Sequence, residues 1–236
     1  MAQTKRPYDA RRRRERAAQE RAETRRRVVE AARELFLERG YVATTMADIV
    51  SEAGVALQSV YTAGQSKADL LHLVTDLAVA GDSQEVMLVD RPVYAAIAAE
   101  PDPARQVEML ASLTAATMER LAPVWITYRE AAAVDPKAAA NLVAAHRRRH
   151  ETFRTLARMI PERHLRNDHD RSADTAWAVG SIDVFLLLRT VLEWSATQYA
   201  DWLRDTLIDQ LVAPPAAHRR GRSSGAPRSR KAGGSV

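Results

Sequence analysis

The chain has 236 residues, carries a formal net charge of +5 and contains no cysteine. A chain of this length can bury one large hydrophobic core or two small ones, and the lack of cysteine excludes disulfides, thiolate zinc sites and a cysteine nucleophile. The N-terminal segment carries arginine clusters, and no apolar run approaches the roughly 20 residues that span a bilayer. We therefore expect a soluble, cytoplasmic protein with no membrane partner.

Positive charge is concentrated at the two ends of the chain. Residues 1–27 hold eleven Lys and Arg against four Asp and Glu, and residues 213–236 hold six against none. Because the two ends together carry +13 and the whole chain +5, residues 28–212 carry −8. Clustered positive charge favours a polyanionic partner, since neutralised phosphates release counterions. We interpret residues 1–14 as a basic disordered arm and residues 213–236 as a basic disordered tail, for which a purely solubilising role is an equal alternative.

Helical apolar spacing begins after the N-terminal arginines. The residues that follow the i, i+4, i+7, i+8 pattern are Val28, Ala32, Leu35 and Phe36. Gly40 stands where a C-terminal cap belongs. The pattern therefore predicts a first helix over about residues 15–39.

Two capping signatures follow. Thr45-Met-Ala-Asp48 has the form of a capping box, in which a hydroxyl and a carboxylate satisfy free N–H groups. It predicts a second helix from Met46 to Ala53, ended by Gly54. Ser66-Lys-Ala-Asp69 repeats the signature and predicts a helix through about Ala80. The segment between Gly54 and Ser66 has room for only two helical turns.

That short segment completes a helix-turn-helix arrangement. Three helices with a tight glycine-containing turn between the second and the third have this form, and a two-turn helix with small side chains fits the major groove, which is about 12 Å wide. We expect Val55 and Val60 to anchor the segment inward. The residues left to face outward are Leu57, Gln58, Ser59, Tyr61 and Thr62.

Each outward residue has a possible DNA partner. Gln58 can pair with a base edge and Leu57 can touch a thymine methyl group, whereas Ser59 and Tyr61 can donate to phosphates. Lys67 begins the following helix, where its ammonium would meet the same phosphates. Each residue alone is more often ordinary surface; their joint spacing favours a DNA contact. The full set of expected DNA contacts is Thr44, Thr45, Leu57, Gln58, Ser59, Tyr61, Thr62 and Lys67.

The stretch "TTMADIVSEAGVALQSVYTAGQSKADLL" resembles the DNA-binding segment of TetR-family transcriptional regulators, which typically reads T-x-x-x-I-A-x-x-A-G-V-S-x-x-T-x-Y-x-x-F-x-S-K-x-x-L. The resemblance covers about residues 25–72. The residues in register are Thr45, Ile49, Ala53, Gly54, Val55, Tyr61, Ser66, Lys67 and Leu70. It implies a homodimeric, all-helical repressor whose C-terminal domain binds a small effector and whose Tyr61 and Lys67 grip the DNA backbone.

Three residues depart from the family pattern. Ala56 stands where the family commonly has Ser, which removes a capping hydroxyl worth about 1 kcal/mol. Ala63 and Gly64 replace a usual His or Tyr and a usual Phe. We expect Gly64 to loosen the end of the third helix, because glycine costs up to roughly 1 kcal/mol in a helix interior. The third helix would then finish ordering on the operator.

The rest of the chain is helical, and an all-α fold is expected because no window shows sustained period-2 alternation. Proline and loop signals divide it into helices near residues 92–99, 103–121, 123–134, 137–159, 172–191 and 198–212. The domain boundary should fall within residues 73–80. We therefore expect a helix-turn-helix domain over residues 15–75 and a helical effector-binding and dimerisation domain over residues 76–212.

The last two helices are the expected homodimer interface. Residues 173–191 carry apolar groups on two faces, Trp177, Val184 and Leu188 on one and Val179, Ile182 and Leu186 on the other, and such a helix needs two partners. A second seam is formed by Tyr199, Trp202, Leu203, Thr206, Leu207 and Leu211. Together these helices would build a four-helix bundle on a two-fold axis. A purely monomeric core remains an alternative.

We expect an effector pocket between the middle helices. Pockets are mostly apolar with a few polar groups that fix orientation. The candidate lining residues are Met118, Trp125, Tyr128, Arg129, Phe153, Trp177 and Asp183, with Arg129 or Asp183 setting the sign of the ligand charge. Ordinary core packing is the alternative for each of them. An effector that moves the helix over residues 66–80 would change the separation of the two recognition helices.

Other classes of function have weaker signals. The sequence has no nucleophile elbow and no phosphate-binding glycine loop. His146 and His150 have metal-ligand spacing but flank "RRR", and "NDHD" at 167–170 is a polar loop. We therefore expect no enzyme, no cofactor and no metal. A nucleoid or RNA-binding protein that uses only its tails remains open, and it would bind without sequence preference.

Overall fold

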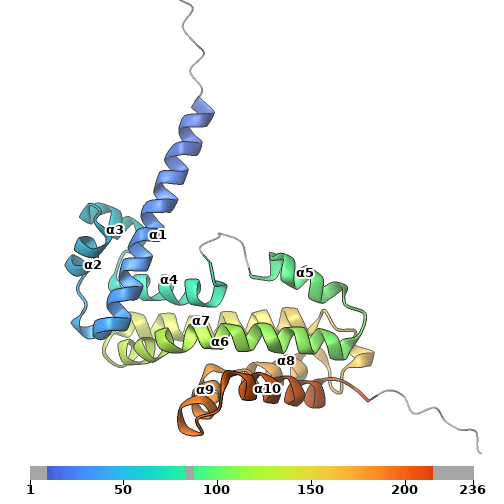
Figure 1. The fold of residues 1–236 in the computed structure, drawn as a ribbon. Coiled ribbons are helices and arrows are strands. Elements are labelled where there is room, and N and C mark those ends of the chain that lie inside the picture. The colour runs from blue at the N-terminus through green and yellow to red at the C-terminus, as the bar shows by residue number, and fades with distance from the viewer. Residues whose placement is uncertain (1–9, 83–87, 215–236) are drawn as a thin grey trace, which may run out of the picture.

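The computed structural model describes residues 10–82 and 88–214. These residues form helices and no β-sheet, which confirms the expected all-α class (Figure 1). No helix in this described part is long and apolar enough to cross a membrane. The basic C-terminal segment lies outside the described residues, apart from residues 213 and 214.

The first helix is longer than predicted. α1 spans Ala10–Ala43, and its N-terminal half stands away from the other helices (Figure 1). Residues 10–14 are therefore helical, so the prediction of a disordered arm over residues 1–14 is wrong for this part. Gly40 interrupts the helix with a φ of 78°, a left-handed value that glycine adopts without steric cost. The expected stop at this residue is confirmed.

The next three helices follow the capping signals. α2 spans Met46–Ala53, with the predicted capping box at Thr45 and a left-handed Gly54 at its end. α3 spans Leu57–Ala63, and α4 spans Lys67–Ala80 with Ser66 as its N-cap. Ala56 precedes α3 without a side-chain cap.

Gly64 lies outside α3, in extended conformation with φ −149°. The predicted cost of glycine inside a helix therefore does not apply. A Cβ at this position would lie 2.6 Å from Cδ2 of Leu70, which is fully buried. Gly64 thus makes space for Leu70, and the expected loosening of α3 by a helical glycine is wrong.

The second half of the chain contains two long central helices. After a 3₁₀ turn at Leu88–Asp90 come α5 (Pro92–Ala99), α6 (Pro103–Val134) and α7 (Pro136–Ala157). Pro123 does not divide α6, contrary to the prediction of separate helices at 103–121 and 123–134. Pro123 is exposed, while Leu121, Val124 and Trp125 beside it are buried, so packing on both sides of the proline holds the helix continuous.

The C-terminal part is more divided than predicted. After a 3₁₀ turn at Glu162–His164, α8 spans His169–Val179 and α9 spans Ile182–Leu186, continued by a π-helical turn at Leu187–Val191. The single helix predicted over 172–191 is interrupted at Gly180 because Ser181 caps a new helix by accepting from the N–H of Val184 at 3.3 Å. α10 spans Ala196–Leu211.

These helices form layers around α6 and α7. α1 and α4 pack on one side of the central pair, and α8 and α10 pack on the other (Figure 1). The apolar seam of α10 is turned inward: Tyr199, Leu203, Leu207 and Leu211 are all buried, against α6 and α8. For these four residues the prediction of a seam that faces a second subunit is therefore wrong, whereas Trp202 and Thr206 of the same seam are half-buried and stay a prediction. The exposed apolar side chains in this region are instead Leu187, Val191 and Leu192, at the π-helical turn.

Candidate DNA-binding surface and effector cavity

The outward side chains of α3 form an open surface. Leu57 is 54% exposed and Tyr61 is 43% exposed, and Gln58 and Thr62 are also exposed. Ser59 is half-buried, and Val60 is the fully buried anchor of the helix. The side of α3 opposite Val60 is therefore free for a partner.

Thr44 and Thr45 have different environments. The Thr44 side chain is fully buried, and its hydroxyl donates to the carbonyl oxygen of Gly40 at 2.8 Å. It cannot reach DNA, so the prediction of a side-chain contact from Thr44 is wrong. Thr45 is exposed at the start of α2, and its hydroxyl donates to Oδ2 of Asp48 at 2.7 Å. That bond lowers the pKa of Asp48.

Lys67 is directed back into the protein rather than held free at the surface. Its ammonium donates to the carbonyl oxygens of Tyr41 and Thr44 at 2.7 and 2.9 Å, and it lies 4.2 Å from the ring centroid of Tyr41. Desolvation by these neighbours lowers the pKa of Lys67. Since an ammonium has three donors, two of them already bind the end of α1.

Arg27 is a residue that the sequence interpretation missed. It lies on α1, and its Nη2 donates to the carbonyl oxygens of Ala53 and Gly54 at 2.6 and 3.2 Å. These are carbonyls at the end of α2, where the helix leaves them without intrahelical partners. Arg27 therefore fixes the turn that precedes α3. Its position within an arginine cluster gave no signal for this role.

The exposed half of α1 is strongly basic. Residues 11–27 carry nine arginines and three glutamates, and all nine arginine side chains are exposed. Some of them are paired along the helix, as in Arg11–Glu15 at 2.8 Å. The helix therefore presents a net positive rod beside the helix-turn-helix.

Polar contacts join the DNA-binding helices to the central pair. The hydroxyl of Tyr41 donates to Oδ2 of Asp135, the N-cap of α7, at 2.5 Å, and this bond lowers the pKa of Asp135. Burial raises the pKa of Tyr41 itself. Lys137 pairs with Asp69 at 2.6 Å. The start of α7 is thereby connected to the end of α1 and the start of α4.

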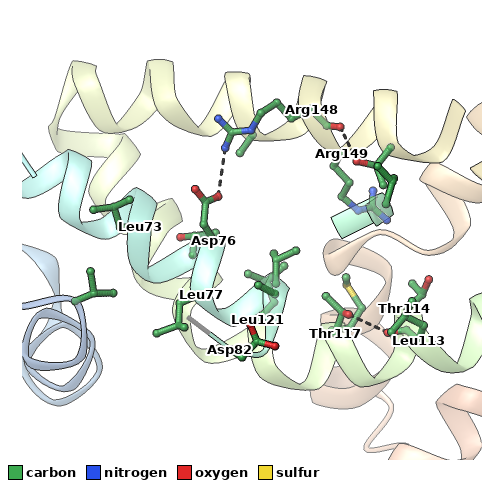
Figure 2. A pocket seen from close by; sticks show the side chains of 18 of the residues that line it. Leu73, Asp76, Leu77, Asp82, Leu113, Thr114, Thr117, Leu121, Arg148 and Arg149 are labelled. Carbon is green, nitrogen blue, oxygen red and sulfur yellow. Dashed lines mark hydrogen bonds and ion pairs between the residues drawn. The ribbon is translucent and has the colours of Figure 1, made fainter. Parts of the chain in front are cut away.

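A cavity of about 880 Å³ lies between α4, α6 and α7, with α1 and α5 at its margins (Figure 2). Of the predicted effector residues, Met118, Trp125 and Phe153 lie in its wall. The wall also includes residues that the sequence interpretation missed: Leu73, Asp76, Leu77, Arg148 and Arg149. The volume falls within the range of roughly 300–1,000 Å³ found for small-molecule sites.

The other four predicted effector residues do not line the cavity. Tyr128 is fully buried, and its hydroxyl lies 3.4 Å from Nδ1 of His72. Arg129 and Asp183 are both exposed and pair with each other at 3.6 Å, so neither sets the ligand charge inside the cavity. Trp177 packs beyond the wall, with its ring against those of His146 and His150. These placements correct the predicted lining.

Two arginines bring charge into the cavity wall. Arg148 lies 2.7 Å from Nε2 of His72 and 3.4 Å from Oδ1 of Asp76 (Figure 2). Burial is the main cause that lowers the pKa of His72, and Arg148 adds to it. Arg149 donates to the backbone at the end of α8, and burial lowers its pKa to about 10.

The two sequence features considered for metal binding have other partners. His150 pairs with Asp174 at 2.7 Å, and the His146 ring packs edge-on to that of Trp125. In the 167–170 loop, Asp168 caps α8 and Asp170 pairs with Arg154 at 3.1 Å. Within residues 10–82 and 88–214, no three His, Asp or Glu side chains gather as a metal site.

Comparison with known proteins identifies both the first domain and the fold. Residues 28–74 match the family model described as bacterial regulatory proteins, tetR family. A TetR-family regulator structure from Mesorhizobium loti has a TM-score of 0.60 and 18% identity, over 82% of this chain and 98% of that one. The structure of NalD, the secondary repressor of the MexAB-OprM multidrug efflux pump in Pseudomonas aeruginosa, has a TM-score of 0.57 and 20% identity. The match covers 82% of this chain and 98% of that one.

A third related structure contains a ligand. It is a transcriptional regulator from Saccharomonospora viridis in complex with choline, with a TM-score of 0.58 and 21% identity, over 81% of this chain and 99% of that one. No curated protein matches the sequence. The solved structures therefore establish that the fold extends over most of the chain.

Proposed function

We propose that the chain, whose residues 28–74 match the tetR family model, represses transcription from a palindromic operator and is released by a small-molecule effector. The observation that supports this most directly is the open surface of α3, where Leu57, Gln58, Tyr61 and Thr62 are exposed around a buried Val60. A helix presented in this way fits a major groove.

In this proposal the contacts divide by chemistry. Gln58 reads a base edge and Leu57 touches a thymine methyl group, so these two give sequence preference. Phosphates are bound by the hydroxyl groups of Tyr61, Ser59, Thr62 and Thr45, which set the register of the helix on the DNA. Lys67 contributes at most its remaining N–H to a phosphate, since two are bonded to α1.

The operator is proposed to be palindromic because we propose that the protein acts as a homodimer. The exposed side chains of Leu187, Val191 and Leu192 form an apolar patch at the π-helical turn, and such a patch favours a self-complementary two-fold interface. Leu187→Asp combined with Val191→Asp should give monomers by analytical ultracentrifugation and weaken operator binding. If this variant still forms dimers at the concentrations at which the wild type does, the patch is not the dimer interface.

The position of the cavity supports the proposed release by an effector. Its wall contains Leu73 and Leu77 of α4 and Val29 of α1, and these two helices support α3 through the packing of α1 on α2, α3 and α4. A ligand that binds one arrangement of α1 and α4 more tightly than another shifts the population toward it. Two recognition helices whose separation changes no longer match grooves about 34 Å apart.

The experiment that tests DNA recognition begins with selection of binding sites from random duplex DNA by the full chain. A palindromic product is expected. Gln58→Ala should then relax preference at one base pair per half-site, at a cost of about 1–3 kcal/mol, and Tyr61→Ala should weaken all sites. Gln210→Ala is the matched control, because Gln210 is exposed on α10, far along the chain from α3.

The same experiment separates the proposal from a protein that binds nucleic acid through its basic ends alone. Such a protein would yield no enriched sequence, and its affinity would be the same in the Tyr61→Ala variant. If selection gives no consensus, or if Tyr61→Ala binds as the wild type does, the regulator proposal fails.

A further inference from the structure

Hydrogen bonds and an aromatic ring hold the guanidinium of Arg149. It lies on α7 in the wall of the cavity, and its Nη1 and Nη2 donate to the carbonyl oxygens of Trp177 and Gly180 at 2.9 and 2.6 Å. Its guanidinium carbon lies 4.6 Å from the ring centroid of Phe153, which lines the same cavity. Backbone bonds and ring packing therefore hold the guanidinium in one place. Figure 2 shows Arg149 beside Arg148 on α7.

This cation has no anionic partner. Among the described residues, no carboxylate lies within 4.0 Å of Arg149, whereas the neighbouring Arg148 pairs with Asp76 at 3.4 Å and Arg91 pairs with Asp82 at 2.8 Å. Asp76 and Asp82, which both line the cavity, are thus already paired. Arg149 therefore has no ion-pair partner in the described part of the wall; Asp183 favours its charged form only from beyond 4.0 Å and pairs with Arg129 at 3.6 Å.

The guanidinium also retains donors. An arginine has five N–H bonds, and the two backbone carbonyls use two of them. Burial in this wall disfavours the charged form, which is the main cause that lowers the pKa of Arg149. A carboxylate beside it would restore the lost solvation and match the planar fork of the guanidinium.

The remainder of the wall is mostly apolar. Leu73 and Leu77 of α4, Met118 and Leu121 of α6, and Leu156 of α7 lie around the same space. A ligand that fills it must cover these side chains while its head reaches Arg149. The cavity is therefore suited to a molecule with an apolar body and one polar end.

Building on the proposed release by an effector, we infer that the effector is a monoanionic amphiphile whose carboxylate binds Arg149 and whose apolar body lies along Leu73, Leu77 and Met118. An alcohol with the same body gains no ion pair. A quaternary ammonium with the same body places its positive charge beside that of Arg149. The wall therefore discriminates by charge rather than by size.

The test uses three probes with a common ten-carbon body: decanoate, decanol and decyltrimethylammonium. Each is titrated into the full-length protein at pH 7.5, with binding followed by isothermal calorimetry. The wild type should bind decanoate about tenfold more tightly than decanol, the effect expected of one charge-assisted contact, and decyltrimethylammonium most weakly. Equal affinities for decanoate and decanol in the wild type would overturn the inference without any variant.

Variants then assign the preference to one side chain. Arg149→Met should lose about tenfold in decanoate affinity and leave decanol affinity within about twofold, whereas Arg149→Lys should keep part of the preference. Arg147→Met is the matched control, because Arg147 is an exposed neighbour on α7 that does not line the cavity. Decanol binding reports whether the cavity of Arg149→Met is intact. A variant that binds decanol but keeps the full preference for decanoate contradicts the assignment.

Operator binding is measured separately, on DNA selected by the wild type. If decanoate binds through Arg149 and operator affinity stays unchanged, the ligand assignment holds and the proposed release by an effector fails. If decanol or decyltrimethylammonium releases the operator and decanoate does not, release by an effector holds and the carboxylate assignment fails.

Discussion

The ammonium of Lys67 stabilises the junction between α1 and α4, and its removal should destabilise the protein. In the Lys67→Met variant the aliphatic stem is retained, but the carbonyl oxygens of Tyr41 and Thr44 lose donors at 2.7 and 2.9 Å. Bonds to a charged group contribute about 1.5–3 kcal/mol each. The methionine also avoids the desolvation of a half-buried ammonium, which offsets part of this loss. We expect a net decrease of about 2–3 kcal/mol in the free energy of unfolding.

The assay is thermal unfolding followed by circular dichroism. For a chain of this size, the expected loss corresponds to a fall of about 4–12 °C in Tm. Lys137→Met is the matched control, because Lys137 pairs with Asp69 at 2.6 Å but is 49% exposed, and surface pairs contribute at most about 1 kcal/mol. If Lys67→Met unfolds at the same temperature as Lys137→Met, Lys67 does not act as a cap for α1.

Three further outcomes follow from the structure. Gly64→Ala should destabilise the protein by about 1–3 kcal/mol in urea unfolding, since its Cβ would meet Leu70 at 2.6 Å; wild-type stability would mean that Leu70 moves freely. Burial lowers the pKa of His72 in the folded protein, so as pH falls the unfolded chain takes up a proton at this side chain before the folded one does. His72 therefore decreases the free energy of unfolding as pH falls below about 6.5. His72→Gln should show a shallower decline of Tm between about pH 7 and 5, and the same decline as in the wild type would contradict this. Replacing the arginines at 11–14 by glutamine should weaken binding to all DNA sequences alike. The slope of log K against log salt concentration should become shallower by up to about 0.9 per lost phosphate contact, and an unaltered slope would mean that these arginines do not contact DNA.

The sequence was sufficient to predict those parts of the fold that depend on residues close together in the chain. The capping box at Thr45, the left-handed Gly54 and the Ser66 cap all depend on groups within four residues, and each helix boundary that they predicted was confirmed. The exposure of Gln58 and Tyr61 followed for the same reason. Once the helix limits and the anchor at Val60 were known, the opposite face was known as well.

The sequence was insufficient where the partner of a surface decides its role. The apolar seam of α10 was correctly recognised as apolar, but periodicity does not say whether α6 or a second subunit covers it. Pro123 looked like a helix break because the packing that retains it comes from distant residues. Thr44 and Thr45 are adjacent and chemically alike, yet one is fully buried and the other exposed.

The charged residues of the cavity could not be predicted from the sequence for the same reason. Arg129 and Asp183 were the residues predicted to set the sign of the ligand charge, but they pair with each other at the surface. Arg149 belongs to a run of three arginines that appeared only as bulk positive charge. Its role depends on the carbonyls of Trp177 and Gly180, which lie about thirty residues further along the chain and make no local pattern.

The arrangement of the cavity explains how one small molecule could influence a surface that it does not touch. Arg27 of α1 holds the end of α2, and Lys67 of α4 holds the end of α1, so α3 is positioned by both helices. The cavity lies against the same two helices at Val29 and Leu77. A ligand that contacted only α6 and α7 would bind without a preference between arrangements of α1 and α4, and it would leave operator affinity unchanged however tightly it bound. A coupling of about 1–3 kcal/mol, typical of allosteric proteins, therefore has to arise from the contacts on α4 and α1. Shortening Leu77 to Ala should accordingly reduce the effect of a bound ligand on operator affinity more than it reduces ligand affinity, whereas shortening Leu156 of α7 should do the reverse; equal losses in both variants would contradict this route of coupling.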